Sequence, residues 1–342
     1  MFNAISEGFH GILDFIHKVQ GPYTYEDPIT GYSIFVFLFL IGLEVTLSWK
    51  YEPELYKWKD FQASTMMGAG AIFISVFTKS LSYIMYIWVY DIFNPLVNGE
   101  RINIFGWHAF SMAWYMFLIC QVLDDFNYYW HHRLSHTVRC LWAAHIVHHS
   151  SDNFNLGTAF RNGWITIIYK PFFWVWLPAI GFNPVMVMIC LSIQSIWQFQ
   201  LHSKFVPYLG FLENFINSHK QHQVHHASNV EYMDKNHGGY LNIFDKLFGT
   251  HKVLDEANVD IKFGVVHPPS SYHPIEILTH EYRDIWNDVK STKNFRHKLM
   301  YIFGPPGWRP GDYSQTVKYM QREIEKKKQQ MQKVKEAETV GA

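Results

Sequence analysis

Residues 130–150 read WHHRLSHTVRCLWAAHIVHHS, and residues 219–226 form a second histidine-rich stretch, HKQHQVHH. These two stretches contain three histidine boxes, one of the form HxxxH followed by two of the form HxxHH. We expect the rest of the chain to be organised around one histidine-rich site. The eight candidate metal ligands are His132, His136, His145, His148, His149, His222, His225 and His226.

The spacing within each box predicts a dinuclear metal site. Residues four apart on a helix lie one turn apart on the same face, so His132 and His136 can bind one ion together. Adjacent residues such as His148 and His149 diverge by about 100° around the helix axis, so each HxxHH box can reach two ions. Neutral imidazole is a good ligand for iron, zinc or copper.

The composition indicates a membrane environment. Of the 342 residues, 18% are aromatic and only 17% are charged, which is unusual for a soluble protein. The formal charges balance at zero, so we expect no nucleic-acid partner. The three cysteines form no CxxC pair, and neither a disulfide framework nor a thiolate metal cage is expected; they are Cys120, Cys140 and Cys190.

The first apolar run predicts a membrane span and its orientation. Residues 32–49 carry a single charge, Glu44, and such a run is about long enough to cross a hydrocarbon core of about 30 Å. Clustered lysines in a short loop favour the cytoplasmic side, and the loop after this run contains Lys50, Lys57 and Lys59. Residues 1–31, which lack the pattern of a cleaved signal peptide, predict a short amphipathic helix at the membrane interface.

Further apolar runs predict about four to five transmembrane helices. Residues 66–95 predict one span, and residues 105–123 predict another that leads directly into the first box. Residues 164–180 and 184–200 are separated by so few residues that they permit only a tight helical hairpin. Such a hairpin returns to its starting side, so the second and third boxes face one compartment, which the lysine loop identifies as the cytoplasm.

The region after Thr250 is polar and predicts a cytoplasmic cap of short helices and loops. Apolar residues recur at helical spacing over residues 314–337, with three lysines interrupting them. A solvated terminal helix is expected there, with contact to a membrane surface or a partner as the alternative. The expected fold is therefore an all-α integral membrane protein whose cytoplasmic cap holds the dinuclear site, divided into residues 1–31, 32–250 and 251–342.

Several residues near the boxes are weaker candidates. His202 follows the second arm of the hairpin and is a tentative ninth ligand, while His237 in the DKNHGG motif is either a ligand or part of a polar loop. Four aspartates could orient histidine rings or offset the charge of the metal ions, or could simply cap helices. They are Asp124, Asp125, Asp152 and Asp234. The histidines expected to be bystanders are His131, His219 and His251.

Residues 124–250 resemble the fatty acid hydroxylase and sterol desaturase superfamily of integral-membrane di-iron enzymes. The motifs that carry the resemblance are YYWHHRLSH, WAAHIVHHSSDNFNLGTAFR and VHHASNVEYMDKNHGGYLNIFDKLFGT. The residues of these motifs are similar to those of the alkylglycerol monooxygenase branch and its bacterial relatives. The segment GPPGWRPGD is similar to the bacterial relatives in particular. The resemblance implies iron ligands at all eight box histidines. Alkylglycerol monooxygenases carry a glutamate where this chain has Thr137, so the resemblance implies a di-iron centre more strongly than an ether-lipid substrate or a tetrahydrobiopterin reductant.

The resemblance implies an oxygenase with two iron ions, which uses O2 as co-substrate to hydroxylate a C–H bond of a lipid drawn from the bilayer. Cleavage of alkylglycerol ether lipids is the leading interpretation, and a sterol or fatty-acyl desaturase or hydroxylase is the alternative. A zinc-binding membrane scaffold or transporter is a remote third interpretation, because transport predicts ionisable residues deep within several spans. The sequence contains no flavin-binding or cytochrome b5-like segment, so an external electron donor, with tetrahydrobiopterin as one candidate, is expected.

Aromatic side chains crowd the predicted hairpin. They could line a route for the lipid, or they could face the membrane as packing residues. They are Phe172, Phe173, Trp174, Trp176, Trp197 and Phe199.

Overall fold

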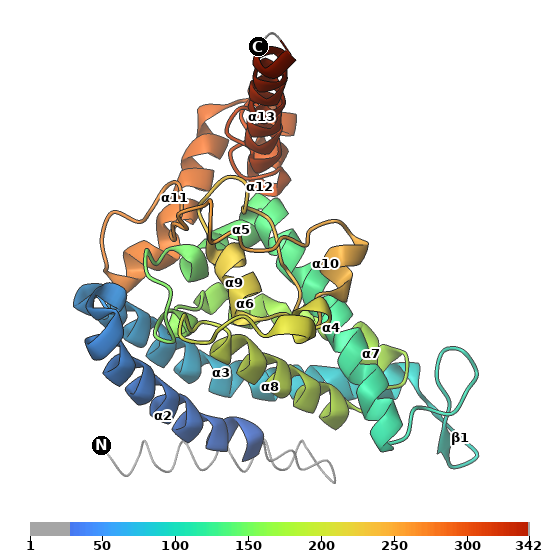
Figure 1. Cartoon of the computed structure of the whole chain (residues 1–342). Coiled ribbons are helices and arrows are strands. Elements are labelled where there is room, and N and C mark those ends of the chain that lie inside the picture. Colours follow the sequence, from blue (N-terminus) through green and yellow to red (C-terminus); the bar gives the residue numbers. More distant parts are fainter. Residues whose placement is uncertain (1–27, 341–342) are drawn as a thin grey trace, which may run out of the picture.

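The computed structural model describes residues 28–340, which fold into a mostly helical structure (Figure 1). The predicted helical class is confirmed, since the regular strands in this range form a single short hairpin. The predicted interfacial helix over residues 1–31 lies almost entirely outside the described residues.

Two long helices open the described chain. Helix α2 spans Pro28–Tyr51 and helix α3 spans Trp58–Phe93, with a 3₁₀ turn at Pro53–Leu55 between them. Both are long and apolar enough to cross a membrane, and within residues 28–340 no other helix meets that criterion. Helix α3 would measure about 54 Å, which exceeds a hydrocarbon core of about 30 Å, so the single span predicted for residues 66–95 fits within it.

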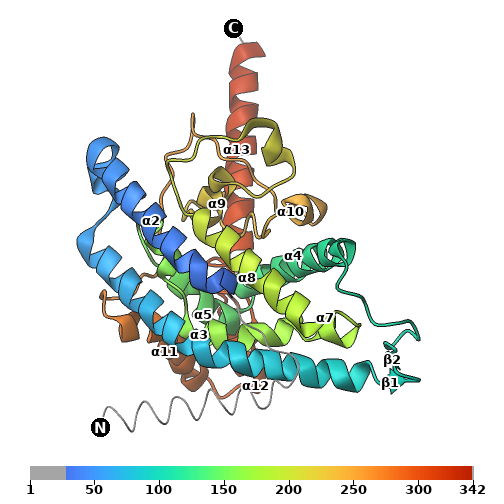
Figure 2. The same ribbon diagram turned by 90° about the horizontal axis from the view of Figure 1, so that it is seen from below.

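Helix α3 leads to a tight β-hairpin. Strands β1 (Leu96–Val97) and β2 (Glu100–Arg101) pair antiparallel. Asn98 and Gly99, which connect them, both have positive φ angles of 53° and 86°. Asn-Gly is the favoured pair for such a two-residue connection because both residues tolerate the left-handed region. In Figure 2, α3 runs along the molecule from the side of α11 to this hairpin.

The span predicted for residues 105–123 is wrong in its first half. The side-chain oxygen of Asn103 accepts hydrogen bonds from the backbone N–H groups of Phe105 and Trp107, at 3.0 and 3.1 Å. These bonds close a turn and compete with helix formation. Helix α4 therefore begins only at Trp114, and it continues to Thr137 through the first histidine box.

The predicted hairpin has one continuous arm and one interrupted arm. Helix α8 spans Pro184–Gln200, as predicted, and the side chain of Asn183 caps it by accepting from the N–H of Val185 at 2.9 Å. The other arm is not the continuous helix that was predicted, because Pro171 breaks its hydrogen-bond ladder. This arm consists of α6 (Trp164–Tyr169), a 3₁₀ segment (Lys170–Trp174) and α7 (Trp176–Ala179).

The main apolar core lies where α3, α4, α7 and α8 meet. Its side chains are large and fully buried, which fixes how these helices pack and therefore where α4 and α8 end. The fully or almost fully buried members are Tyr83, Tyr86, Cys120, Trp174, Leu177, Phe182, Met186, Val187, Met188 and Cys190.

Most of the remaining helices lie above α2, α3 and α8 in the view of Figure 1, and α5 and α11 pack against the first half of α3. The remaining helices are α5 (Arg139–His149), α9 (His219–His226), α10 (Ile243–Leu247), α11 (Pro274–Ser291), α12 (Phe295–Phe303) and α13 (Val317–Val340), with 3₁₀ turns at Thr158–Phe160 and Gly210–Asn214. The predicted terminal helix thus begins slightly later than expected. The side chain of Gln321 anchors α13 by donating to the carbonyls of Val230 and Met233 at 3.0 and 2.8 Å.

Candidate metal centre

Helices α4 and α5 present the first two boxes to each other. Only Val138, whose backbone is extended at φ −113° and ψ 116°, separates the two helices, so the chain reverses sharply there. His132 faces His145 with ring centroids 4.9 Å apart, and His136 faces His149 at 4.8 Å. His132 and His136 lie one turn apart on α4, and His145 and His149 lie one turn apart on α5. The four rings meet between the two helices.

The third box lies on a short polar helix that is almost wholly buried. Ser218 caps α9 by accepting a hydrogen bond from the N–H of Gln221 at 3.3 Å. Every residue of α9 except Lys220 is buried. Burial of such a polar helix is costly unless its side chains find partners, and most of its histidine rings point toward the rings of α4 and α5 or toward His202.

The box histidines and His202 come together as two groups. In each group, the candidate ligand atoms all lie within 4.8 Å of one another. Each HxxHH box contributes to both groups, which follows from the divergence of adjacent residues around a helix. The first group is His132, His136, His145, His149 and His225, and the second group is His148, His202, His222 and His226.

Within each group the ring nitrogens have the spacing of ligands around one ion. Nε2 of His145 lies 3.1 Å from Nε2 of His132 and 3.1 Å from Nε2 of His149. In the second group, Nε2 of His202 lies 3.1–3.2 Å from the Nε2 atoms of the other three histidines. Two nitrogens that bind an ion at about 2.1 Å, at right angles to each other, lie about 3.0 Å apart. The donor sets therefore fit a transition-metal ion in each group.

Backbone carbonyl groups fix the orientation of four of these rings. The Nδ1 atom of each ring lies 2.9–3.2 Å from a carbonyl oxygen, so Nδ1 carries the proton and Nε2 keeps its lone pair. Nε2 of His136 and Nε2 of His225 are buried and have no hydrogen-bond partner, which also suits a metal ligand. The four pairs are His132 with His237, His148 with Arg161, His202 with Gln198, and His225 with Lys235.

Burial keeps the histidines of both groups neutral. Desolvation lowers the pKa of every one of them below the ordinary value, and for most of them the neighbouring histidines lower it further. The pKa falls to about 4 for His148 and to about 3 for His225. Because a metal ion binds the neutral imidazole, both groups are ready to bind metal without releasing protons at neutral pH.

His237 lies beside the first group. Its ring centroid is 4.9 Å from that of His136 and 5.5 Å from that of His132. It is fully buried, and neither of its ring nitrogens has a hydrogen-bond partner. His237 therefore belongs to the polar loop and also contacts the first group. It stays a candidate ligand.

Of the four candidate aspartates, Asp234 is the one that contacts a box histidine. Its Oδ1 atom lies 3.4 Å from Nδ1 of His136, and burial raises the pKa of Asp234 to about 7. Asp124 and Asp125 instead accept hydrogen bonds from an indole and from two backbone N–H groups. Asp152 lies at the surface and forms an ion pair with a lysine at 2.7 Å. The sequence pattern alone could not distinguish these four environments.

A buried carboxylate on α2, which the sequence analysis treated only as a charge in an apolar run, supports the second group. Glu44 is only 3% exposed. It accepts hydrogen bonds from the hydroxyls of Tyr56 and Ser203, both at 2.6 Å, and from the N–H of Leu156 at 2.7 Å. Ser203 directly follows His202, so Glu44 ties this ligand candidate to α2. A lone carboxylate within a membrane-type helix is a functional signal in itself, and it was visible in the sequence.

A second buried carboxylate, on α3, has a parallel role that was missed. Asp60 pairs with the guanidinium of Arg161 at 2.9 Å and accepts from the hydroxyl of Ser151 at 2.7 Å. The carbonyl of Arg161 in turn faces Nδ1 of His148. Helix α2 thus helps to position His202 through Ser203, and helix α3 helps to position His148 through Arg161.

The DKNHGG motif forms a loop that serves the first group. Asp234 and Asn236 adopt positive φ angles of 54° and 55°, which few residues tolerate. Asp245 accepts hydrogen bonds from the backbone N–H groups of His237 and Gly238, at 2.8 and 2.7 Å. These bonds hold in place the loop whose carbonyls orient two histidines of the first group.

The three histidines predicted to be bystanders belong to neither group. His131 is buried against Phe173 and Trp174, with ring centroids 4.9 and 5.7 Å away. Most of the aromatic residues of the hairpin also serve as packing: Trp174 donates to Asp124 and Trp176 to Asn127, while Phe199 stacks on Phe37. Exposed Phe172 is an exception. The members of the bystander set are His131, His219 and His251.

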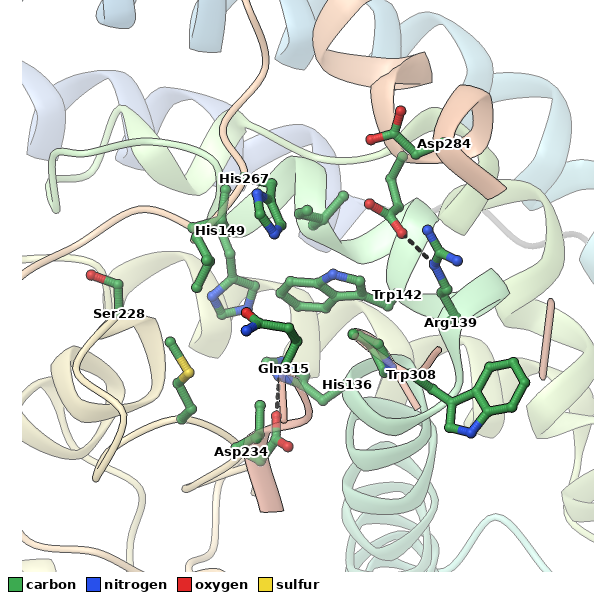
Figure 3. A pocket seen from close by; sticks show the side chains of 18 of the residues that line it. His136, Arg139, Trp142, His149, Ser228, Asp234, His267, Asp284, Trp308 and Gln315 are labelled. Atoms are coloured by element: carbon green, nitrogen blue, oxygen red, sulfur yellow. Dashed lines mark hydrogen bonds and ion pairs between the residues drawn. The ribbon is translucent and has the colours of Figure 1, made fainter. Parts of the chain in front are cut away.

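A cavity of about 440 Å³ reaches the first group from the side of the C-terminal helices. His136, His149 and His225 contribute to its wall, and the indole of Trp142 lies between His149 and Arg139 (Figure 3). The lining combines carboxylates and Arg139 with apolar side chains such as Ile146, Val266 and Met320. Arg139 pairs there with two carboxylates at 2.8 and 2.6 Å, and further lining residues are Asp234, Asp284, Asn287, Trp308 and Gln315.

Comparison with known proteins shows what the chain is similar to. Residues 117–250 match the family model described as fatty acid hydroxylase. The chain is 33% identical over 277 residues to an alkylglycerol monooxygenase of Homo sapiens, covering 80% of this chain and 59% of the relative. It is 29% identical over 314 residues to the alkylglycerol monooxygenase of Xenopus tropicalis, covering 90% and 66%. A Delta(7)-sterol 5(6)-desaturase of Gibberella zeae is 24% identical over 160 residues, covering 44% of this chain and 45% of that relative.

No solved structure matches the chain. The chain spans 59% and 66% of the length of the two alkylglycerol monooxygenases above, so they contain regions that this chain does not match. The matched family region contains all three boxes, His202 and the DKNHGG loop. Residues 117–250 thus match the fatty acid hydroxylase family, and over most of its length the chain is similar in sequence to alkylglycerol monooxygenases.

Proposed function

We propose that this protein is a membrane-bound di-iron oxygenase that uses O2 to hydroxylate a C–H bond of a lipid, with alkylglycerol ether lipids as its leading substrate class. The observation that carries the proposal is the convergence of nine neutral histidines, seven of them buried and two partly buried, into two groups of ligand-sized spacing. The similarity to alkylglycerol monooxygenases supports the ether-lipid substrate.

The first and second groups would each hold one iron ion, and His237 is a candidate additional ligand of the first. When bound, the two ions would supply the activation of O2 that an unactivated C–H bond requires. The chain's own residues orient the rings through backbone carbonyls and keep them neutral by burial. The packed aromatic and aliphatic core beneath α4 and α8 would exclude water from the reacting carbon.

The expected products follow from the substrate class. Hydroxylation of the carbon next to an ether oxygen consumes one O2 and two electrons with two protons, and it releases one water. The resulting hemiacetal breaks its C–O bond to the former ether oxygen and yields an aldehyde and a free alcohol. A desaturase would instead remove a second hydrogen from the neighbouring carbon, and the similarity to a sterol desaturase keeps this as the second candidate.

We assign the membrane-facing surface to the helices with exposed apolar side chains. Helices α2 and α3 would cross the bilayer, and the first half of α4 together with α6, α7 and α8 would be embedded beside them in the membrane domain. The lysines at the junction of α2 and α3 favour a cytoplasmic location of the centre. The expected cytoplasmic cap then corresponds to α11, α12 and α13.

We assign the cavity above the first group to the external electron donor. Burial of the Arg139 ion pairs under a lipid tail would be costly, whereas a small reductant with both polar and apolar parts matches the mixed lining and can enter from water. The indole of Trp142, which lies 5.1 Å from the ring of His136 between centroids, offers a flat surface beside the first group. Tetrahydrobiopterin is one candidate for this reductant.

The test is turnover under labelled dioxygen with anaerobically purified, iron-loaded protein in lipid nanodiscs. We expect two irons per chain and incorporation of one ¹⁸O atom into the aldehyde released from an alkylglycerol. A product with a new double bond and no label would favour the desaturase. Zinc as the sole bound metal, with no O2-dependent turnover of any lipid, would overturn the oxygenase proposal and favour a zinc-binding scaffold or transporter.

A further inference from the structure

An exposed apolar ridge lies next to the third histidine box and supplies no residue to either histidine group. Its six large side chains come from the segment around the 3₁₀ turn Gly210–Asn214 and from helix α10, and each is between 54% and 73% exposed. Solvent-exposed apolar groups so numerous in two short segments usually mark a contact surface. The ridge comprises Tyr208, Phe211, Leu212, Phe215, Ile243 and Leu247.

The two segments of the ridge are fastened to each other. Ile216 and Leu241 form a backbone bridge, and the N–H of Asn242 donates to the carbonyl of Phe215 at 3.1 Å. The side chain of Asn242 also donates to the carbonyl of Glu213 at 2.6 Å. The exposed side chains therefore stand on a connected backbone framework.

The same framework is attached to the third box. The side chain of Gln221, on α9, donates to the carbonyl of Glu213 at 3.0 Å, and the N–H of Asn217 donates to the carbonyl of Tyr240 at 2.7 Å. His222 follows Gln221 directly. The position of the ridge thus sets the position of α9, and with it the distance of the centre from whatever the ridge contacts.

The ridge continues an apolar stripe along α4. Tyr115, Leu118, Val122 and Phe126 recur at steps of three and four and so share one face of that helix; the first three are 47–53% exposed. Phe126 meets Phe244 of α10, with ring centroids 5.4 Å apart. The stripe therefore leads without interruption from the start of α4 to the ridge.

The charges of the ridge fit the surface of a bilayer. Residues 205–216 and 241–248 contain two acidic residues, Glu213 and Asp245, and both are buried, at 6% and 1% exposure. Lys246 is their one exposed charge. An exposed apolar surface that presents a lysine and no carboxylate is the pattern of an interfacial membrane segment.

We propose that this ridge inserts into the interfacial layer of the same bilayer that α2 and α3 are able to cross, and that it fixes the third box at the lipid surface. The ridge side chains would lie among headgroups and the first carbons of the acyl chains, about 5–10 Å deep. The functional part of this inference rests on the proposed function. The ridge would hold the lipid-facing side of the centre at the depth from which a substrate lipid leaves the bilayer.

The test uses a photoreactive residue in the full-length, metal-loaded protein reconstituted in phosphatidylcholine nanodiscs. p-Benzoylphenylalanine replaces Phe211 or Leu247, and the matched control replaces Tyr313, which is 54% exposed beside Asp312 and Ser314. We expect phosphatidylcholine adducts at Phe211 and Leu247 that exceed those at Tyr313 by about tenfold. Two metal ions per chain in each variant would show that the substitution has not unfolded the centre.

Three results would overturn the proposal: cross-links from Phe211 and Leu247 to a second copy of the chain, cross-links to another protein, or no lipid adducts above the control. The proposed function is tested separately. In the double variant Phe211→Ser and Leu247→Ser, turnover of a lipid supplied in the bilayer should fall relative to turnover of the same lipid supplied in detergent micelles. Lipid adducts without any turnover would support the ridge and count against the oxygenase, and turnover without adducts would do the reverse.

Discussion

At the scale of single residues, the function of each histidine depends on which nitrogen points into its group. Backbone carbonyls bind Nδ1 of His132, His148, His202 and His225, so Nε2 of each faces its group. This arrangement distinguishes them from a buried histidine such as His131, which packs among aromatic rings. All five residues are histidines. What distinguishes the four ligand candidates is the backbone carbonyl that binds Nδ1 and leaves Nε2 free to bind a metal ion.

Substitution of one histidine should remove one metal ion selectively. His148→Ala deletes one of the four ligand candidates of the second group, so we expect iron to fall from two per chain to about one, with loss of turnover. The measurement is iron by mass spectrometry on protein purified from membranes. His251→Ala, a histidine outside both groups, is the control and should retain two irons. Full iron and full turnover in His148→Ala would contradict the assignment of the second group.

At the scale of elements, the long apolar helices also support the second group. Helix α2 contributes Glu44, which binds Ser203 beside His202, and helix α3 contributes Asp60, which binds Arg161 behind His148. The first group relies instead on the loop held by Asp245. The two metal positions are therefore supported by different elements and should respond to different substitutions.

Neutralising Glu44 should weaken the second group. In Glu44→Gln the side-chain NH2 either faces the N–H of Leu156, which cannot accept, or forces the hydroxyl of Ser203 to accept where it now donates, so the hydrogen bonding weakens by about 1–3 kcal/mol. We expect a lower thermal midpoint and partial loss of one iron per chain. The control is Glu52→Gln, because Glu52 is exposed and its 3.7 Å pair with Lys204 contributes about 0–1 kcal/mol. Equal effects of the two substitutions would argue against a specific role for Glu44.

At the scale of the whole molecule, the metal ions would join segments that lie far apart in the sequence. The first group draws on α4, α5 and α9, and the second on α5, the end of α8 and α9. Helix α9 is short and polar, with little apolar surface of its own to bury. Its stability should therefore depend on the ions more than that of α8, which packs in the apolar core.

Removal of the metal should loosen α9 first. Because metal binding stabilises the folded state by mass action, chelation should lower the thermal midpoint of the chain. Hydrogen–deuterium exchange should then rise over residues 219–226 while residues 184–200 stay protected. The comparison is the same protein before chelation and after iron is restored. Unchanged exchange in α9 after complete metal removal would show that the ions do not stabilise it.

The metal-free protein should lose stability in acid. Histidine titrates near pH 6.5 in an unfolded chain, whereas the folded pKa is about 4 for His148 and about 3 for His225. Below pH 6.5 the unfolded chain therefore binds more protons than the folded chain. Stability is complete above pH 6.5 and is lost as the pH falls toward the folded pKa values, by about 1.4 kcal/mol per pH unit for each such histidine.

Urea unfolding of the metal-free protein in detergent at pH 7.5 and pH 5.5 checks this expectation. The midpoint should be lower at pH 5.5, and His148→Gln should reduce the difference between the two midpoints. A midpoint that is equal or higher at pH 5.5 would contradict the depressed histidine pKa values.

The sequence by itself determined the features that depend on local spacing. The i, i+3 and i+4 intervals of the three boxes fix which rings share a helix face and which diverge, because helix geometry within one element needs no tertiary contact. The apolar runs likewise predicted α2, α3 and α8. Where a local competitor was overlooked, the prediction was wrong, as with the Asn103 turn before α4 and Pro171 in the first arm of the hairpin.

The tertiary structure alone decided how distant segments combine. It brought His202 to His222 and His226, placed the carbonyl of Arg161 behind His148, and gave Glu44 a partner 159 positions away in Ser203. Such contacts depend on the packing of α3, α4, α7 and α8, which fixes where their ends lie. Spacing along the chain carries no information about that packing, since residues far apart meet only when the apolar core positions their helices.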